Sequence, residues 1–358
     1  MKLFHFPYVP LKGVLDHMSI DHIFYLSLCS KKTKSFIIRA QKYQFKKVEY
    51  AYYWTNGRGA VIRVKTISGA LTVIMILFNS EAGYCTRKLE NIRLNELGAP
   101  IDFWRDPADN LQASFCSDNA QSTVESILNH LYDLLGSHIK LWCLGKFPNA
   151  TFVPTVQNIQ MCQIRGDLKH SEVGNILDRA ICLEHFMWIT RDEEDIQLRE
   201  NSKLYDLDTL YLWTETSLAA DVMKRFNGRH VFLWSSNIST RDVIRFLNAW
   251  KSGEKFQNLE VISILNDFKL WKIRDAVEFK EVDTEVEYSF VGKLAEREPY
   301  ASVSFPVELK SHSYMVRKSD GHVASVMMTP SQIYMGVWNM TEKEFLEKFD
   351  KISHMASH

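Results

Sequence analysis

The first forty residues carry apolar side chains at the spacing of amphipathic helices. Four of them recur at i, i+3, i+4 and i+7 and so form one stripe along a helix. They are Leu11, Val14, Leu15 and Met18. A second helix, with Ser19 or Asp21 as its N-cap, carries Ile23, Leu26 and Leu28. The segment is too short to bury these side chains by itself, so we expect it to dock against the rest of the chain or another protein.

Residues 44–97 change to a composition typical of β-strands, rich in β-branched and aromatic side chains. The turns between these runs contain Gly57, Gly59 and Gly69, and glycine tolerates the positive φ angles of tight turns. The pattern predicts antiparallel hairpins or a meander. Residues 98–120, with Pro100, Pro107 and many polar side chains, are predicted to be a connector.

From residue 121 onward, helix-like and strand-like segments alternate, and the strand-like segments share the spacing L-x-x-L-x-L. Strict and looser copies of it start at residues 139, 156, 183, 207, 228 and 259. Most of the intervals lie in or near the roughly 20–29 residues of leucine-rich repeats. The pattern therefore predicts a leucine-rich-repeat-like α/β region with parallel strands. An irregular α/β domain is the alternative, because Glu215 and Asp267 stand where an Asn ladder is expected.

Amphipathic helices are predicted between these strands, at residues 122–135, 171–181, 217–226 and 239–252. The last has the strongest signals, since Ser239 and Asp242 can form a capping box and Gly253 can terminate the helix. Residues 283–358 again have a composition typical of strands. A hairpin turn is predicted at Asp320-Gly321, and a closing helix capped by Thr341.

The chemistry that composition allows is limited. The chain has 43 basic and 43 acidic residues, which removes the simplest argument for a nucleic-acid or anionic-membrane partner. Its longest uninterrupted apolar run, residues 73–78, is far below the roughly 20 residues of a membrane span. None of the 12 histidines has zinc-ligand spacing, and nucleophile-elbow and phosphate-loop motifs are absent. We therefore predict a protein without a catalytic site, metal or cofactor.

Two pairs of polar residues and the tryptophans are further candidates for a functional role. Asp206 with Asp208, and Cys182 with His185, are interpreted as structural positions rather than as reactive pairs. Nine tryptophans are a high count, and several fall at strand ends. Core packing is the default, but aromatic side chains dominate interface hot spots. The candidates for contact with a protein ligand are Trp188, Trp213 and Trp234.

Three stretches of the chain resemble one known family. Phe6-Pro7, the helical leucines that follow and the string LSLCSKKTKSF resemble an F-box of the nematode-expanded type, with Phe6 in the position of the usual leucine. Residues 237–265 (NISTRDVIRFLNAWKSGEKFQNLEVISIL) resemble the type 2 F-box-associated domain of that family. Residues 317–326 (RKSDGHVASV) and Val337-Trp338 are similar to its tail.

The resemblance implies a substrate-recognition subunit of an SCF-type ubiquitin ligase, located in the cytoplasm or nucleus. Its F-box would bind a Skp-type adaptor, and through it a cullin, while the C-terminal region would hold an unknown target protein. The implied adaptor contacts are Phe6, Pro7, Leu11, Val14, Leu15, Met18, Ile23, Leu26, Leu28 and Lys34. The implied segments are the F-box (1–43), the β segment (44–97), the connector (98–120), the repeat-like domain (121–282) and the C-terminal hairpin region with its closing helix (283–358).

A second hypothesis is a leucine-rich-repeat-like binding module unrelated to ubiquitin, in which residues 6–36 cap its own sheet. Deleting residues 1–42 is expected to destabilise such a capped module, whereas an F-box deletion is expected to leave a folded remainder.

Overall fold

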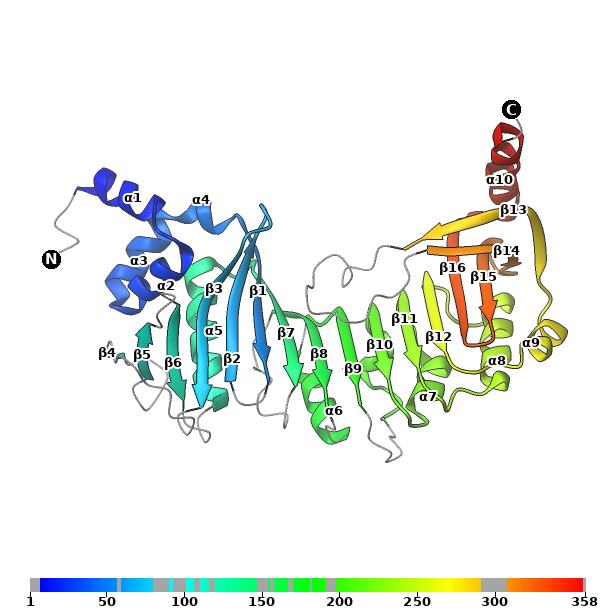
Figure 1. Ribbon diagram of the computed structural model, residues 1–358, viewed down its shortest axis with the longest axis horizontal. Coiled ribbons are helices and arrows are strands. Elements are labelled where there is room, and N and C mark those ends of the chain that lie inside the picture. Colours follow the sequence, from blue (N-terminus) through cyan, green and yellow to red (C-terminus); the bar gives the residue numbers. More distant parts are fainter. Residues whose placement is uncertain are drawn as a thin grey trace. The chain divides into compact units, whose positions relative to one another are not determined.

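The computed structural model describes residues 7–56, 59–79, 90–92, 101–105, 110–115, 120–146, 154, 158–166, 170–180, 182–190, 198–290 and 308–356. The chain forms two compact units, residues 1–184 and 185–358. Each unit combines a sheet with helices, and the N-terminus is helical, so the predicted mixed α/β class is confirmed (Figure 1).

The first unit contains six described helices and eight described strands. The helices are α1 (Tyr8–Asp16), α2 (Ile20–Leu28), α3 (Lys31–Ala40), α4 (Lys42–Phe45), α5 (Ala120–Leu135) and α6 (His170–Arg179). The strands are β1 (Val48–Thr55), β2 (Gly59–Thr66), β3 (Leu71–Asn79), β4 (Glu90–Ile92), β5 (Ile101–Arg105), β6 (Leu111–Phe115), β7 (Lys140–Lys146) and β8 (Ile159–Arg165).

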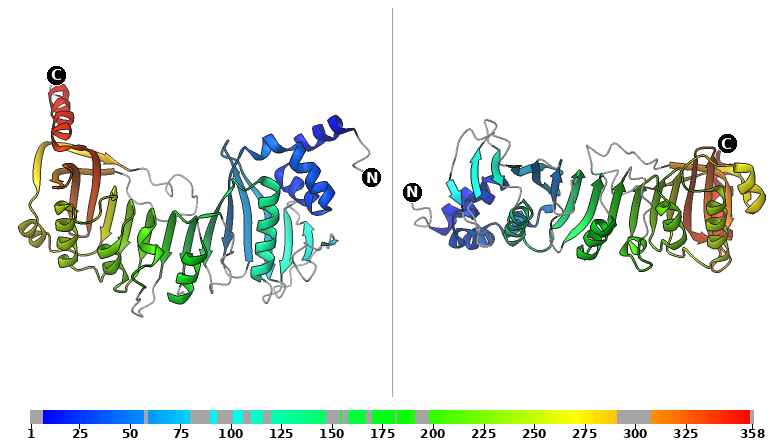
Figure 2. Two further views of the ribbon diagram at one scale, coloured as in Figure 1. Left: turned by 180° about the vertical axis from the view of Figure 1, so that it is seen from behind. Right: turned by 90° about the horizontal axis from the view of Figure 1, so that it is seen from below.

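The strands of the first unit lie in the order β8-β7-β1-β2-β3-β6-β5-β4. Strands β1, β2 and β3 form the antiparallel meander that the sequence predicts. Strand β6 then pairs with β3 in parallel, and β7 pairs with β1 in parallel, so α5 is the crossover between them. Helix α5 lies against one face of this sheet (Figure 2). The sheet therefore supports the helix to which the N-terminal segment is attached.

The predicted connector, residues 98–120, contains the strands β5 and β6. Ile101 and Phe103 of β5 are buried on either side of Asp102, which is the period of a strand. Each of the two strands has only five residues and lies close to a proline, so the alternation is too short to stand out in the sequence.

The second unit contains a short 3₁₀ turn, η5 (Lys203–Asp206), and four helices and eight strands among its described residues. The helices are α7 (Leu218–Arg225), α8 (Thr240–Ser252), α9 (Leu270–Ala276) and α10 (Glu342–Ala356). The strands are β9 (His185–Ile189), β10 (Thr209–Trp213), β11 (His230–Trp234), β12 (Val261–Leu265), β13 (Lys280–Ser289), β14 (Glu308–Val316), β15 (His322–Thr329) and β16 (Gln332–Thr341).

Its strands lie in the order β13-β14-β15-β16-β12-β11-β10-β9. Strands β9 to β12 are parallel and in register, and each begins two residues after a repeat start, at 183, 207, 228 or 259. The parallel pairing predicted from the repeat spacing is thus confirmed for these four strands. Helices α7 and α8 are the crossovers between β10, β11 and β12, and β16 closes the parallel set by antiparallel pairing with β12.

Polar residues directly after the parallel strands hold their register without an Asn ladder. The backbone N–H groups of Thr190, Thr214 and Ser235 donate to the last carbonyl oxygen of the neighbouring strand, at 2.9, 3.0 and 3.3 Å. All three side chains are buried. Asn266 continues the series, because its amide donates to the Ile238 carbonyl oxygen at 2.7 Å. The residues that fix the register are thus those directly after the strands, one position before Glu215 and Asp267.

Local signals of the second unit are confirmed. Ser239 and Asp242 form the capping box of α8, and Gly253 ends the helix with a φ of 77°. Gly321 has a φ of 74° in the turn between β14 and β15. The Thr341 backbone N–H donates to the Glu344 carboxylate at 2.7 Å, and this bond caps the start of α10. The Phe345 side chain on α10 is buried in a cluster with β13, β14 and β15.

Candidate protein-binding surfaces

Helices α2 and α3 dock against α5 of their own unit, which begins about eighty residues later in the chain, and α1 packs on α3. Phe24 of α2 is fully buried, and its ring meets the His130 imidazole edge to face at 5.6 Å. Ser27 and the His130 Nε2 atom are hydrogen-bonded at 2.8 Å, and Lys34 of α3 pairs with Asp133 at 2.8 Å. Burial lowers the pKa of His130 to about 4, so the imidazole is neutral at neutral pH.

Apolar side chains remain exposed on the outer side of this helical segment. Tyr8, Val9 and Val14 of α1 are 53%, 77% and 55% exposed, and Tyr43 of α4 is 79% exposed. Pro7, the N-cap of α1, is also exposed. Clustered exposed apolar side chains mark interaction sites in soluble proteins. Tyr8, Val9 and Tyr43 are not among the contacts predicted from the sequence, because apolar periodicity does not show which side chains stay exposed.

In the second unit, a row of apolar side chains follows the carboxyl ends of the parallel strands. Trp213 of β10 and Trp234 of β11 lie opposite each other in register, and their rings stack at 4.1 Å with an interplanar angle of 3°. Trp234 is 39% exposed and Trp213 is half-buried. Together with Ile189 of β9 they border a shallow apolar hollow. We call Ile189, Trp213 and Trp234 the strand-end row.

The remainder of this sheet face is covered. Tyr211 and Phe232 stack at 4.4 Å in the middle of β10 and β11, and both are buried. Phe290, directly after β13, lies 4.6 Å from the His230 ring and 5.9 Å from the Phe232 ring. Among the described residues of β9, β10 and β11, the strand-end row is consequently the accessible part of this face.

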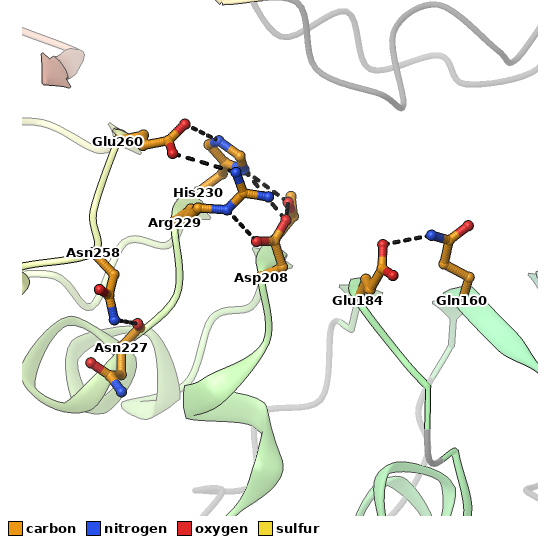
Figure 3. A network of polar contacts seen from close by, with 9 residues as sticks. Gln160, Glu184, Asp208, Asn227, Arg229, His230, Asn258 and Glu260 are labelled. Carbon is orange, nitrogen blue, oxygen red and sulfur yellow. Dashed lines mark hydrogen bonds and ion pairs between the residues drawn. The ribbon is translucent and has the colours of Figure 1, made fainter. Parts of the chain in front are cut away.

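Charged side chains stand directly before the parallel strands, at the other end of the sheet. Arg229 Nε donates to Asp208 Oδ1 at 2.5 Å, and Arg229 Nη1 donates to Glu260 Oε1 at 3.4 Å (Figure 3). Burial opposes ionisation of Asp208, but the Arg229 guanidinium outweighs it and lowers the pKa of this carboxyl. Asp206, by contrast, is exposed. This network was not predicted from the sequence, although one charged residue stands immediately before each of β10, β11 and β12.

Thr209, His230 and Glu260 form a hydroxyl–imidazole–carboxylate series within this network. Burial lowers the pKa of His230, and its ring is hydrogen-bonded through Nε2 to Glu260 at 3.1 Å and through Nδ1 to the Thr209 hydroxyl at 3.0 Å. Such a series can activate a nucleophile when substrate reaches the hydroxyl. Here Thr209 is only 3% exposed and Phe290 packs on the imidazole. The series therefore ties three strands together rather than presenting a reactive group.

Comparison with protein-family models finds one match within each unit. A model described as F-box domain matches residues 3–45. A second model, described as F-box associated and of type 2, matches residues 203–264, from η5 to β12. This protein carries an F-box domain and an F-box-associated domain. The F-box is thus the helical segment docked on α5, and the F-box-associated match contains Trp213, Trp234 and the charged network. Searches of curated proteins and of solved structures found no match.

The structure places the ten residues predicted to bind an adaptor in different environments. Four of them, Leu11, Leu15, Ile23 and Leu28, are buried inside the chain. Met18, Leu26 and Lys34 are half-buried, Pro7 and Val14 are exposed, and Phe6 lies outside the described residues. Packing within the first unit already covers these four side chains, so they do not need a partner to be buried. Their role as adaptor contacts stays a prediction.

The three tryptophans predicted to contact a target also separate. Trp188 is fully buried, because alternation along β9 turns it to the sheet face opposite Ile189. Only Trp213 and Trp234 share the accessible strand-end row of the F-box-associated domain. Ser19, one of the two predicted caps, occupies the N-cap position of α2, but its hydroxyl bonds His22 instead of the backbone.

Among the described residues, no group of three or more His, Cys, Asp or Glu side chains could hold a metal ion. None of the described helices combines the length and the apolar character needed to cross a bilayer. Cys143 and Cys162 face each other on β7 and β8, and burial raises the pKa of the Cys162 thiol to about 12. These thiols are therefore unreactive core residues.

Proposed function

We propose that this protein is a substrate-recognition subunit of an SCF-type ubiquitin ligase. The observation that supports the proposal most is the presence of an F-box domain and an F-box-associated domain in one chain. The first would bind a Skp-type adaptor joined to a cullin, and the second would hold a target protein. The contribution of such a subunit is proximity, because tethering raises the effective concentration of target lysines near the ubiquitin-loaded enzyme.

On the adaptor side, we propose that α1 makes the contact through its exposed apolar residues Tyr8, Val9 and Val14. Leu11 and Leu15 of the same helix are buried and attach it to the rest of the F-box. In this arrangement a partner covers apolar surface that is otherwise exposed to water, which favours association at roughly 25 cal/mol per Å² of buried apolar area.

The double substitution Val9→Asp/Val14→Asp is expected to weaken binding of a purified Skp-type adaptor at least about 100-fold, because two buried carboxylates would be unpaired at the interface. Isothermal titration calorimetry measures the effect. Ile67→Asp/Leu71→Asp is the matched control, since both residues are exposed apolar side chains of the same unit outside the F-box match. Equal affinity of both double variants would exclude α1 as the contact.

On the target side, we propose that the strand-end row is the binding surface of the F-box-associated domain. Stacked tryptophans offer a large rigid apolar area at low conformational cost, which is the usual composition of interface hot spots. Phe290 packs on His230 and Phe232 in the same face, whereas the side chains of the strand-end row remain accessible. Removal of Trp234 should therefore release targets without disturbing the F-box.

Trp234→Ala is expected to abolish capture of target proteins in cells. Both this substitution and its control are introduced into the Val9→Asp/Val14→Asp chain. That chain would retain targets, because it cannot deliver them to a ligase. Quantitative mass spectrometry compares the co-purified proteins with those of a Trp271→Ala control, which removes an indole that is 63% exposed and outside the row. Retention of the same proteins by Trp234→Ala would contradict the assignment of this surface.

We further propose that the parallel part of each unit is leucine-rich-repeat-like. The in-register strands β9 to β12 and the polar series after them support this within the second unit, as do the parallel strands β7 and β8 within the first. The five-segment division of the chain and its location in the cytoplasm or nucleus stay predictions. A binding module unrelated to ubiquitin is not favoured, because the F-box match at residues 3–45 supports the adaptor-binding role proposed for the N-terminal helices.

A further inference from the structure

The F-box region carries a strong positive charge on a chain that is neutral overall. Residues 7–47 contain eight basic and two acidic side chains, an excess of six positive charges, whereas the whole chain has 43 of each sign. The rest of the chain therefore has an equal excess of negative charge. The basic residues are Lys12, Lys31, Lys32, Lys34, Arg39, Lys42, Lys46 and Lys47.

Most of this charge is not neutralised within the chain. Lys12 pairs with Asp16 at 2.6 Å and Lys34 pairs with Asp133 at 2.8 Å. Six of the eight cations are exposed, and among the residues that the structure describes none of the six forms a salt bridge; they are Lys31, Lys32, Arg39, Lys42, Lys46 and Lys47. Exposed cations without a carboxylate partner are available to a partner molecule of opposite charge.

Two of these cations flank an aromatic pair that joins α1 to α3. The Tyr8 ring meets the Phe36 ring edge to face at 5.8 Å, and Tyr8 is half exposed. Lys32 precedes Phe36 by four positions and Arg39 follows it by three, so both cations share its side of α3. We call Tyr8, Lys32, Phe36 and Arg39 the basic–aromatic surface.

We propose that the basic–aromatic surface binds an acidic surface on the adaptor protein and that charge attraction accelerates their association. The proposal rests on the adaptor-binding role proposed above and adds the kind of surface that the F-box recognises. Apolar contact at Tyr8 and Val9 holds the complex, while the flanking cations steer the encounter. The negative excess on the remainder of the chain repels the same acidic partner and so directs it to the F-box end.

Stopped-flow measurements of the full chain with a purified Skp-type adaptor test the proposal. Association is expected to slow about tenfold or more between about 50 and 500 mM salt, because salt screens attraction between exposed charges. Lys32→Glu/Arg39→Glu is expected to slow association about tenfold at low salt and to flatten or invert the salt dependence. Lys224→Glu/Lys255→Glu makes the same change in net charge on exposed residues of the second unit and is expected to leave the rate within about twofold.

The possible results separate this proposal from the proposed function. Salt-independent association of the wild-type chain, or equal rates for both charge-reversal variants, overturns the electrostatic proposal while adaptor binding stands. No adaptor binding at any salt concentration overturns the proposed function itself. Tighter binding of the wild-type chain to phosphatidylserine vesicles or to single-stranded RNA than to the adaptor, lost in Lys32→Glu/Arg39→Glu, assigns the surface to that partner and overturns the proposal. The salt series on the wild-type chain remains decisive if the variant fails to fold.

Discussion

Arg317→Met is expected to destabilise the second unit by about 1–3 kcal/mol, because Asp320 and the Gln257 carbonyl oxygen lose their hydrogen bonds to a buried guanidinium. Arg317 is 3% exposed and forks onto Asp320, with Nη2 donating to Oδ2 at 2.6 Å and Nε donating to Oδ1 at 2.9 Å. Its Nη1 donates to the Gln257 carbonyl oxygen at 3.1 Å, and the guanidinium lies over the Trp250 ring at 5.3 Å. One side chain thus connects the β14–β15 turn to α8 and the loop after it.

Urea unfolding followed by circular dichroism measures this loss. Arg241→Met is the matched control, since Arg241 is an exposed residue in the first turn of α8, and its replacement should change the free energy of unfolding by less than about 0.5 kcal/mol. Similar midpoints for the two variants would show that the Arg317 network contributes little to stability.

Acid is expected to weaken the same connection. The Arg317 guanidinium, together with hydrogen bonds from His322, holds the pKa of Asp320 far below its usual range. A carboxyl whose pKa is lower in the folded chain stabilises the fold above its unfolded pKa of about 4, and that contribution disappears as the pH falls towards the folded pKa. The stability difference between the wild-type chain and Asp320→Asn should therefore shrink below about pH 4.

Phe24→Ala is expected to loosen the F-box from α5 and to cost the first unit about 3–5 kcal/mol, the usual range for removing a fully buried phenylalanine. Phe24 has no exposed surface, and its ring packs on His130, the residue that also bonds Ser27. Hydrogen exchange should show faster exchange of the amides of residues 20–28 while the second unit is unchanged.

Tyr43→Ala is the control for Phe24→Ala, because it also removes an aromatic side chain from the F-box region but one that is 79% exposed. Its free energy of unfolding should stay within about 0.5 kcal/mol of the wild-type value. Unchanged protection of residues 20–28 in Phe24→Ala would mean that packing on α5 does not hold the F-box in place.

The docking of the F-box on α5 also changes how a deletion of residues 1–42 must be interpreted. Loss of these residues would expose the part of α5 around His130 that Phe24 covers. Destabilisation of the first unit is then expected for an F-box as well as for a capping segment. Adaptor binding by exposed-residue variants therefore distinguishes the two hypotheses better than the deletion does.

The sequence by itself determined those features that depend on a few neighbouring residues. The capping box of Ser239 and Asp242, the left-handed Gly253 and the turn at Gly321 were all predictable, because each joins groups within about four positions of one another. Parallel strands followed from the repeat spacing, since each short strand–helix unit can return to the sheet in essentially one way. The two families could be recognised for the same reason, as their motifs are continuous stretches of sequence.

Only the tertiary structure decided which apolar residues are free to meet a partner. Periodicity places Leu11, Leu15 and Val14 on one helix, but it does not reveal that α5 lies near by to cover the segment, since Ser27 and His130 are 103 positions apart. The covering of Tyr211 and Phe232 by Phe290, and the linking of Asp208, Arg229 and Glu260, likewise join distant segments. Burial is a property of the packed chain, so pattern alone identifies the apolar residues and packing selects the ones that remain exposed.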